Sequence, residues 1–239
     1  MLNLFKKPPF FSNLFFLYGL KNTEEIPEEF LDTMNFWKKR SPQFHFKLHN
    51  QSLNILEKDI FTLNKDYMYL FKKLSHSPYE WILKCDLSRY IYCYHYGMSY
   101  SDLDLFPKRN ISNLFKNLQD KNIIFVIETK INLDFAIETS RFPIRKNKVE
   151  YPYRIANFLM FCRVKKHPIW LDVIETIKTR LHHINKNMND YDVLYITGPD
   201  ALTEAVFSNI GKYDDIGFLS VKEFEKNFTT LNNGSWRKA

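Results

Sequence analysis

The stretch WILKCDLSRYIYCYHYGMSYSDLDLF, residues 81–106, is the most informative part of the chain. Its first part reads as a mostly apolar helix that breaks at Gly97. Asp86 and Arg89 are three residues apart, so on a helix they share one face and can point into one site. The alternative is a plain intrahelical ion pair, worth roughly a few tenths of a kcal/mol. On a helix this apolar, an ion pair with no other task is the poorer explanation.

After the break, the sequence predicts a short strand that carries two aspartates. Side chains alternate along a strand, so Tyr100, Asp102 and Asp104 are expected to point to the same side. An Asp-x-Asp pair at the end of a buried strand suits Mn²⁺ or Mg²⁺, which take hard oxygen ligands from one or two carboxylates and from substrate phosphates. An Asp-x-Asp pair on its own is common by chance, so a metal site can be inferred only from the motifs that surround it.

Three motifs follow one another in this stretch: Asp86-x-x-Arg89-Tyr90, Tyr94-x-Tyr96-Gly97 and Tyr100-x-Asp102-x-Asp104. Their order resembles the DXD-containing glycosyltransferases related to the initiating mannosyltransferases of yeast and to bacterial capsular-polysaccharide transferases. It is similar, more distantly, to the glucosylating domain of large clostridial toxins. Met98 stands where the family has a second glycine, so a less permissive turn is expected there.

Composition bounds the remaining possibilities. The chain has 239 residues, 45% of them hydrophobic, and fits one large α/β domain or two small ones. Its net charge of +7 comes from dispersed basic pairs, which favours solvated surface over a nucleic-acid-binding stripe. Cys85, Cys93 and Cys162 lack metal-ligand spacing, and no apolar run is long enough for a signal peptide or a membrane span. We predict reduced thiols, a cytoplasmic location and no transmembrane segment, with peripheral membrane contact left open.

Hydrophobic periodicity predicts strands alternating with helices. The expected strands are 13–20, 44–49 and 123–128, and the expected helices are 26–40 and 51–76. Residues 111–118 are amphipathic. The resemblance implies a single α/β domain of the GT-A type over residues 1–239, with a mostly parallel, Rossmann-like sheet and helices on both faces. The nucleotide is then expected at the carboxyl ends of the strands.

The resemblance also covers positions far from residues 81–106. Tyr18 matches an aromatic residue that stacks on the nucleotide base, although a buried core tyrosine explains it equally well. Asn157 matches an asparagine near the donor sugar, and Thr197-Gly198-Pro199 matches a loop near the phosphates. Ser235 and Trp236 match a tail that closes over the diphosphate, and Asn232 or Asn233 stands near the family's histidine ligand, with Asn233 taken as the third metal ligand.

Two segments are expected to serve the site without belonging to its core. The polar stretch 129–153 is too long for an ordinary connection in a compact domain, so it is interpreted as an acceptor-side loop, with plain surface as the alternative. Residues 231–239 are interpreted as a C-terminal lid, because Trp236 near a chain end needs a partner.

The resemblance implies a metal-dependent hexosyltransferase that retains anomeric configuration. It would move a sugar from a nucleoside-diphosphate sugar, UDP favoured and GDP possible, to a glycan or other hydroxyl acceptor. The implied metal ligands are Asp102, Asp104 and Asn233; the implied donor-binding residues are Tyr18, Asp86, Arg89, Tyr100, Asp102, Ser235 and Trp236; the implied catalytic residues are Asp86, Arg89, Asp104 and Asn157. Two alternatives stay open: a degenerate transferase that binds carbohydrate or nucleotide without turnover, and a nucleic-acid-binding protein, for which no motif is present.

Overall fold

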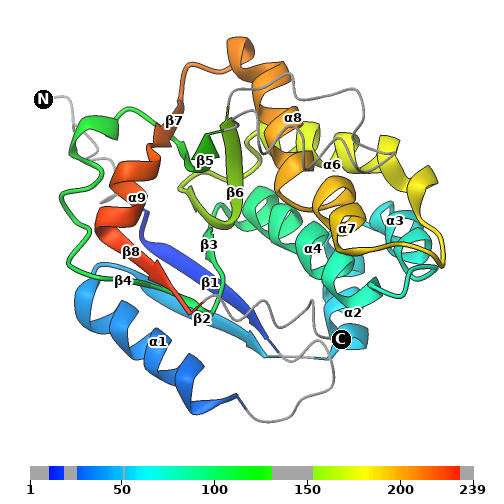
Figure 1. Ribbon diagram of the computed structural model, residues 1–239, viewed down its shortest axis with the longest axis horizontal. Helices are drawn as coiled ribbons and strands as arrows, with labels where there is room; N and C mark the ends of the chain where they lie inside the picture. The colour runs from blue at the N-terminus through cyan, green and yellow to red at the C-terminus, as the bar shows by residue number, and fades with distance from the viewer. Residues whose placement is uncertain (1–10, 19–25, 51, 131–152, 232–239) are drawn as a thin grey trace, which may run out of the picture.

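The fold is built on one six-stranded sheet (Figure 1). The computed structural model describes residues 11–18, 26–50, 52–130 and 153–231. From one edge to the other, the strands are β2 (His45–Asn50), β1 (Asn13–Tyr18), β3 (Ser99–Ser101), β6 (Tyr153–Cys162), β5 (Ile123–Lys130) and β7 (Ile216–Leu219). β1 pairs in parallel with β2 and β3, and β5 pairs in parallel with β7. The predicted mostly parallel sheet is therefore confirmed.

β6 is the antiparallel member of this sheet, and it lies between β3 and β5. It was not among the strands predicted from the sequence. Its residues are buried almost continuously from Ile155 to Cys162, so they show no alternation of apolar and polar side chains. A continuous apolar run of this kind cannot be distinguished from a buried helical segment by periodicity alone.

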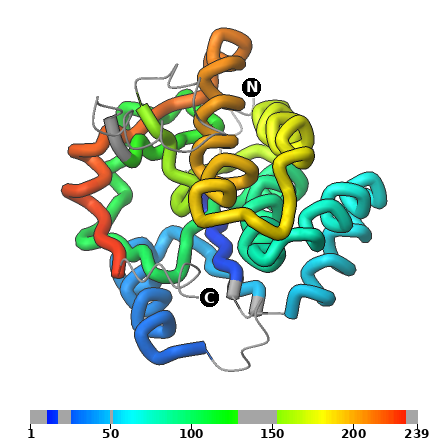
Figure 2. Tube along the Cα trace, turned by 45° about the vertical axis from the view of Figure 1, so that its right-hand side comes forward, coloured from blue at the N-terminus to red at the C-terminus, as the bar shows by residue number. Residues whose placement is uncertain are grey.

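Helices cover both faces of the sheet, as predicted (Figures 1 and 2). One face packs against α2 (Leu53–Leu63), α3 (Tyr67–Leu74), α4 (Glu80–Tyr96), α6 (Ile169–Arg180), α7 (Asp190–Ile196) and α8 (Pro199–Asn209). The other face packs against α1 (Glu28–Arg40), α9 (Val221–Asn227) and a two-stranded sheet of β4 (Leu105–Pro107) and β8 (Phe228–Thr230). Single 3₁₀ turns occur at η1 (Lys116–Leu118), η3 (Leu181–His183) and η4 (Ile210–Lys212).

α1 shows how sequence and packing agree. It begins after Pro27 with two glutamates in its first turn and ends in Lys38–Arg40, which suits the helix dipole at both ends. Trp37 is fully buried, and its indole N–H donates to the backbone carbonyl of Leu105 at 2.7 Å. This bond ties α1 to β4, the strand that follows the two aspartates.

One predicted helix is corrected. The single helix expected over 51–76 is two helices, because the Asn64 side chain accepts a hydrogen bond from the Asp66 backbone N–H at 3.0 Å and forms a local turn. The amphipathic segment 111–118 is a series of turns that ends in η1. There, Asn110 accepts from the Ser112 N–H at 2.8 Å, which again competes with helix formation.

Gly97 ends α4 in the left-handed conformation, with φ +62°. A Cβ atom at this position would lie 2.7 Å from the backbone nitrogen of Lys165, so the chain approaches too closely for any side chain. Met98 is not among the described residues with positive φ, so the expected turn problem at Met98 does not arise. Met98, which stands where the family has a second glycine, directly follows Gly97, the residue in the left-handed conformation.

We expect Gly97→Ala to lower the free energy of unfolding by about 2 kcal/mol or more. Alanine pays roughly 1–2 kcal/mol in the left-handed conformation, and the close backbone contact adds to that cost. Gly211→Ala is the matched control, because a Cβ atom added to Gly211 would have no heavy atom within 4 Å and the residue has no positive φ. Urea unfolding of the two variants measures the difference, and equal midpoints would contradict this account.

Candidate active site

The two aspartates lie at the carboxyl end of β3, in the turn that leads to β4. β3 ends at Ser101, so the prediction that the aspartates continue the strand is corrected. The Asp102 N–H still donates to the backbone carbonyl of Phe158 on β6 at 2.8 Å, while the Leu105 N–H donates back to the Asp102 carbonyl at 3.3 Å. The chain therefore turns immediately after Asp102 and places Asp104 outside the sheet. We call residues 102–104 the aspartate turn.

The Asp102 carboxylate is held by two donors. Its Oδ1 accepts from the Tyr100 hydroxyl at 2.5 Å and from Arg89 Nη1 at 3.2 Å. Tyr100 is buried, whereas about a third of the Asp102 side chain is exposed (34%). Both hydrogen bonds fall on one oxygen, which leaves Oδ2 of Asp102 as the oxygen not used in these two contacts.

Asp104 lies where the C-terminal part of the described chain returns. Its Oδ2 is 3.5 Å from the Thr230 hydroxyl, and its backbone carbonyl accepts from the Leu231 N–H at 2.8 Å. β8 thus pairs with β4 and brings residues 228–231 beside the aspartate turn. Leu231 is the last residue that the structure describes.

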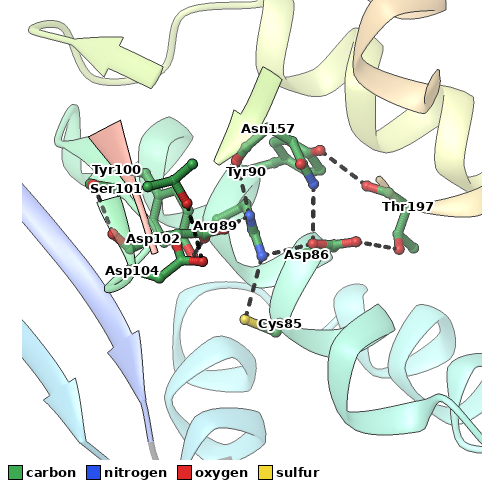
Figure 3. A network of polar contacts seen from close by, with 11 residues as sticks. Cys85, Asp86, Arg89, Tyr90, Tyr100, Ser101, Asp102, Asp104, Asn157 and Thr197 are labelled. Atoms are coloured by element: carbon green, nitrogen blue, oxygen red, sulfur yellow. Dashed lines mark hydrogen bonds and ion pairs between the residues drawn. The ribbon is translucent and has the colours of Figure 1, made fainter. Parts of the chain in front are cut away.

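Arg89 joins the helix to the aspartate turn (Figure 3). Its Nη2 lies 2.7 Å from Asp86 Oδ1 on the same helix, so the predicted shared face is observed as an ion pair. Nη1 reaches Asp102, donates to the backbone carbonyl of Asn157 at 2.9 Å, and the guanidinium lies over the Tyr100 ring. Arg89 is 3% exposed, so these contacts are made out of water. It is not an isolated intrahelical pair.

Asp86 receives donors from two further elements. Asn157 of β6 donates from Nδ2 to Oδ1 at 3.2 Å, and Thr197 donates from its hydroxyl to Oδ2 at 2.9 Å (Figure 3). Thr197 lies between α7 and α8, 111 residues from Asp86 in sequence. The Thr-Gly-Pro motif stood out in the sequence, but nothing there assigned the threonine hydroxyl a partner. Asn157 is thus a neighbour of Asp86, and its predicted place near the donor sugar stays a prediction.

Burial and the charge of Arg89 act in opposite directions on the carboxylates of this cluster. Burial raises the pKa of Asp86 to about 6, against the opposing effects of Arg89 and of the Thr197 and Asn157 donors. Burial also raises the pKa of Asp102, again against Arg89. Burial disfavours the charge on Arg89, but Tyr100 and the two carboxylates raise its pKa well above its ordinary value. The Arg89 guanidinium is therefore the shared counter-charge of two carboxylates, those of Asp86 and Asp102. Asp104, two residues after Asp102, adds a third carboxylate nearby in the sequence.

The structure does not describe every predicted site residue. Tyr18 is the last residue of β1, at the carboxyl edge where the nucleotide was expected, but its side chain lies outside the described part of the molecule. Asn233, Ser235, Trp236 and the predicted lid lie beyond the described residues, as does most of the predicted loop at 129–153. Their roles stay predictions.

Comparison with known proteins identifies the region around this cluster. Residues 27–125 match the family described as glycosyltransferase sugar-binding region containing DXD motif. The matched region, which is less than half of the chain, is similar to that family. The match includes α4, Asp86, Arg89 and the aspartate turn, and it ends within β5.

One characterised relative supports the same relationship. Inositol phosphoceramide mannosyltransferase 1 of Schizosaccharomyces pombe is 31% identical over 101 residues. Those residues are 41% of this chain and 30% of the relative, so the chain spans less than a third of the length of the curated relative it matches.

Two solved structures show a distant likeness to this one. The PaToxG glycosyltransferase is 14% identical with a TM-score of 0.49, and the match covers 86% of this chain and 72% of that one. Mouse xyloside xylosyltransferase 1, in its apo form, is 10% identical with a TM-score of 0.48, and the match covers 87% of this chain and 84% of that one. Likeness at these levels says nothing about donor or acceptor.

Two further observations concern the described residues alone. None of their helices is long and apolar enough to cross a bilayer. No three His, Cys, Asp or Glu side chains among them gather closely enough to hold a metal ion. A cation at the aspartate turn would therefore draw on two carboxylates here and on ligands from substrate or from the rest of the chain.

Proposed function

We propose that this protein transfers a sugar from a nucleoside-diphosphate sugar to a hydroxyl acceptor. The observation that carries the proposal is the buried arginine that links Asp86 on α4 to Asp102 on the aspartate turn. It lies within the matched sugar-binding region, at the edge of the sheet where α/β proteins bind nucleotides.

The aspartate turn fits a divalent cation. Asp102 and Asp104 offer carboxylate oxygens, which are the ligands that Mn²⁺ and Mg²⁺ prefer, and Asp102 keeps Oδ2 clear of its contacts with Tyr100 and Arg89. A cation bound there would neutralise charge that grows on the departing diphosphate. Asn233 is the residue we propose as an additional ligand from the tail.

The chain's own residues would position the donor. Asp86 would accept a hydrogen bond from a sugar hydroxyl, with its carboxylate fixed by Arg89, Asn157 and Thr197. Arg89 would place its own positive charge between the sugar and the diphosphate of the donor, because its guanidinium contacts both Asp86 and Asp102. We propose that the transfer retains the anomeric configuration, through attack on the same face of the sugar.

We propose UDP-sugars as donors, and a glycan or another hydroxyl-bearing molecule as acceptor. The name of the S. pombe relative shows that it acts on inositol phosphoceramide, whose inositol carries hydroxyl groups. A hydroxyl on a lipid headgroup is therefore one acceptor of the proposed class. A cytoplasmic location is also part of the proposal.

A donor screen tests the function. We expect isothermal calorimetry in Mn²⁺ to detect binding of UDP-sugars, with tighter binding than for GDP-sugars, and we expect no binding of either once a chelator removes the cation. Tighter binding of GDP-sugars under matched metal would shift the donor to a guanine nucleotide. Donor binding without transfer or hydrolysis would indicate the degenerate transferase, and no binding of any nucleotide sugar would overturn the proposal.

A further inference from the structure

Thr197 is a fully buried residue whose every polar group is used. Its backbone N–H donates to the Val193 carbonyl at 3.2 Å, and its carbonyl accepts from the Tyr90 hydroxyl at 3.0 Å. Its side-chain hydroxyl donates to Asp86 Oδ2 at 2.9 Å. Tyr90 and Asp86 both lie on α4. Thr197, between α7 and α8, therefore makes two hydrogen bonds to the helix that carries the site.

The backbone around Thr197 is tightly constrained. A Cβ atom on Gly198 would lie 2.8 Å from the backbone of Leu194, so α7 and α8 meet too closely for any other residue there. α8 is in turn tied to β6, because the Thr203 hydroxyl accepts from the Ile155 N–H at 2.9 Å and donates to the Pro199 carbonyl. The position of the Thr197 hydroxyl is therefore set by three packed elements.

The two oxygens of Asp86 are not equivalent. Oδ1 contacts the Arg89 guanidinium at 2.7 Å and accepts a hydrogen bond from Asn157 at 3.2 Å. These two contacts fill the two acceptor positions of a carboxylate oxygen. Oδ2 accepts one hydrogen bond, from the Thr197 hydroxyl, so one of its two acceptor positions remains. Because Thr197 occupies one side of Oδ2, it also determines the direction in which the remaining position points.

We propose that Thr197 is a positioning residue, which aims the remaining acceptor position of Asp86 Oδ2 at a hydroxyl of the donor sugar. The inference rests on the proposed function and adds a residue outside the matched region 27–125 to its site. Thr197 does not contact the donor in this account. It acts through Asp86, and the buried junction of α7 and α8 is what keeps it in place.

Two substitutions separate this role from simple packing. Thr197→Val keeps the shape of the side chain and removes the hydroxyl, whereas Thr197→Ser keeps the hydroxyl. We expect Thr197→Val to lower kcat/KM about 10–100-fold, the usual cost of losing a hydrogen bond to a buried charged group. Thr197→Ser should stay within about threefold of wild type by the same reasoning.

Thr33→Val is the matched control. Thr33 is also buried, but it lies on α1 and its hydroxyl donates to the Glu29 backbone carbonyl at 3.1 Å, so it takes no part in holding Asp86 or Thr197. We expect the kcat/KM of this variant to stay near wild type, whatever its loss of thermal stability. In the pair Asp86→Asn and Thr197→Val, the double variant should be no worse than Asp86→Asn alone, because the second change acts only through the first residue.

The outcomes are distinguishable. If wild type binds and turns over a nucleotide sugar but Thr197→Val has unchanged kcat/KM, or if the two losses multiply in the double variant, the positioning role is wrong. It is also wrong if Thr33→Val lowers kcat/KM as much as Thr197→Val does. A wild-type protein that binds no nucleotide sugar overturns the proposed function and this inference with it.

Discussion

Replacing Asp102 and Asp104 together by asparagine is expected to abolish sugar transfer without unfolding the protein. The change removes two negative charges but almost no volume, and the Asp102 side chain is one-third exposed, so the packing cost is small. Metal-assisted charge stabilisation is worth several kcal/mol, and its loss corresponds to a fall in kcat/KM of about 10³-fold or more. Steady-state kinetics in Mn²⁺ give this number directly.

The same variant gives a second readout that needs no turnover. Added Mn²⁺ and UDP-sugar should raise the melting temperature of wild type, because a ligand that binds only the folded state stabilises it, and should leave the double variant unchanged. Asp120→Asn is the control, since Asp120 is largely exposed and pairs with its neighbour Lys121, away from the aspartate turn. Wild-type activity in the double variant would show that the cation, if one is used, binds elsewhere.

The second large effect is expected on stability. Arg89→Met should lower the free energy of unfolding by about 3–5 kcal/mol, because it leaves the buried Asp86 without its counter-charge. Adding Asp86→Asn should recover part of that loss. Lys178→Met is the control: its pair with Glu175 is more than half exposed on both sides, so its removal should cost no more than about 0.5 kcal/mol.

The pH dependence of Arg89→Met follows from the same pair. Without Arg89, the pKa of Asp86 should rise further above its unfolded value, since burial already raises it to about 6. The folded variant then binds a proton more tightly than the unfolded chain, so its stability falls as the pH rises through the folded-state pKa. The loss should be smaller near pH 5 than near pH 8. Denaturant unfolding at both values measures it, and equal losses would contradict a buried, ionised Asp86.

Local order along the chain was enough to predict several elements of the fold and part of the site. The apolar run before Gly97 predicted α4, its spacing placed Asp86 and Arg89 on one face, and the glycine marked the turn. The charges and the proline around residues 27–40 predicted α1. These features follow from side-chain periodicity and from the backbone preferences of single residues, which act over a few positions. The order of motifs along residues 81–106 also predicted the family that residues 27–125 match.

Which of these residues meet depends on the packing of the whole chain. β6 enters the sheet antiparallel between β3 and β5, and this places Asn157 against Asp86 and its carbonyl against Arg89. The packing of α7 on α8 brings the Thr197 hydroxyl to the other oxygen of Asp86. Contacts across 71 and 111 residues leave no trace in local periodicity, because strand order and helix packing are set by how the whole core is filled.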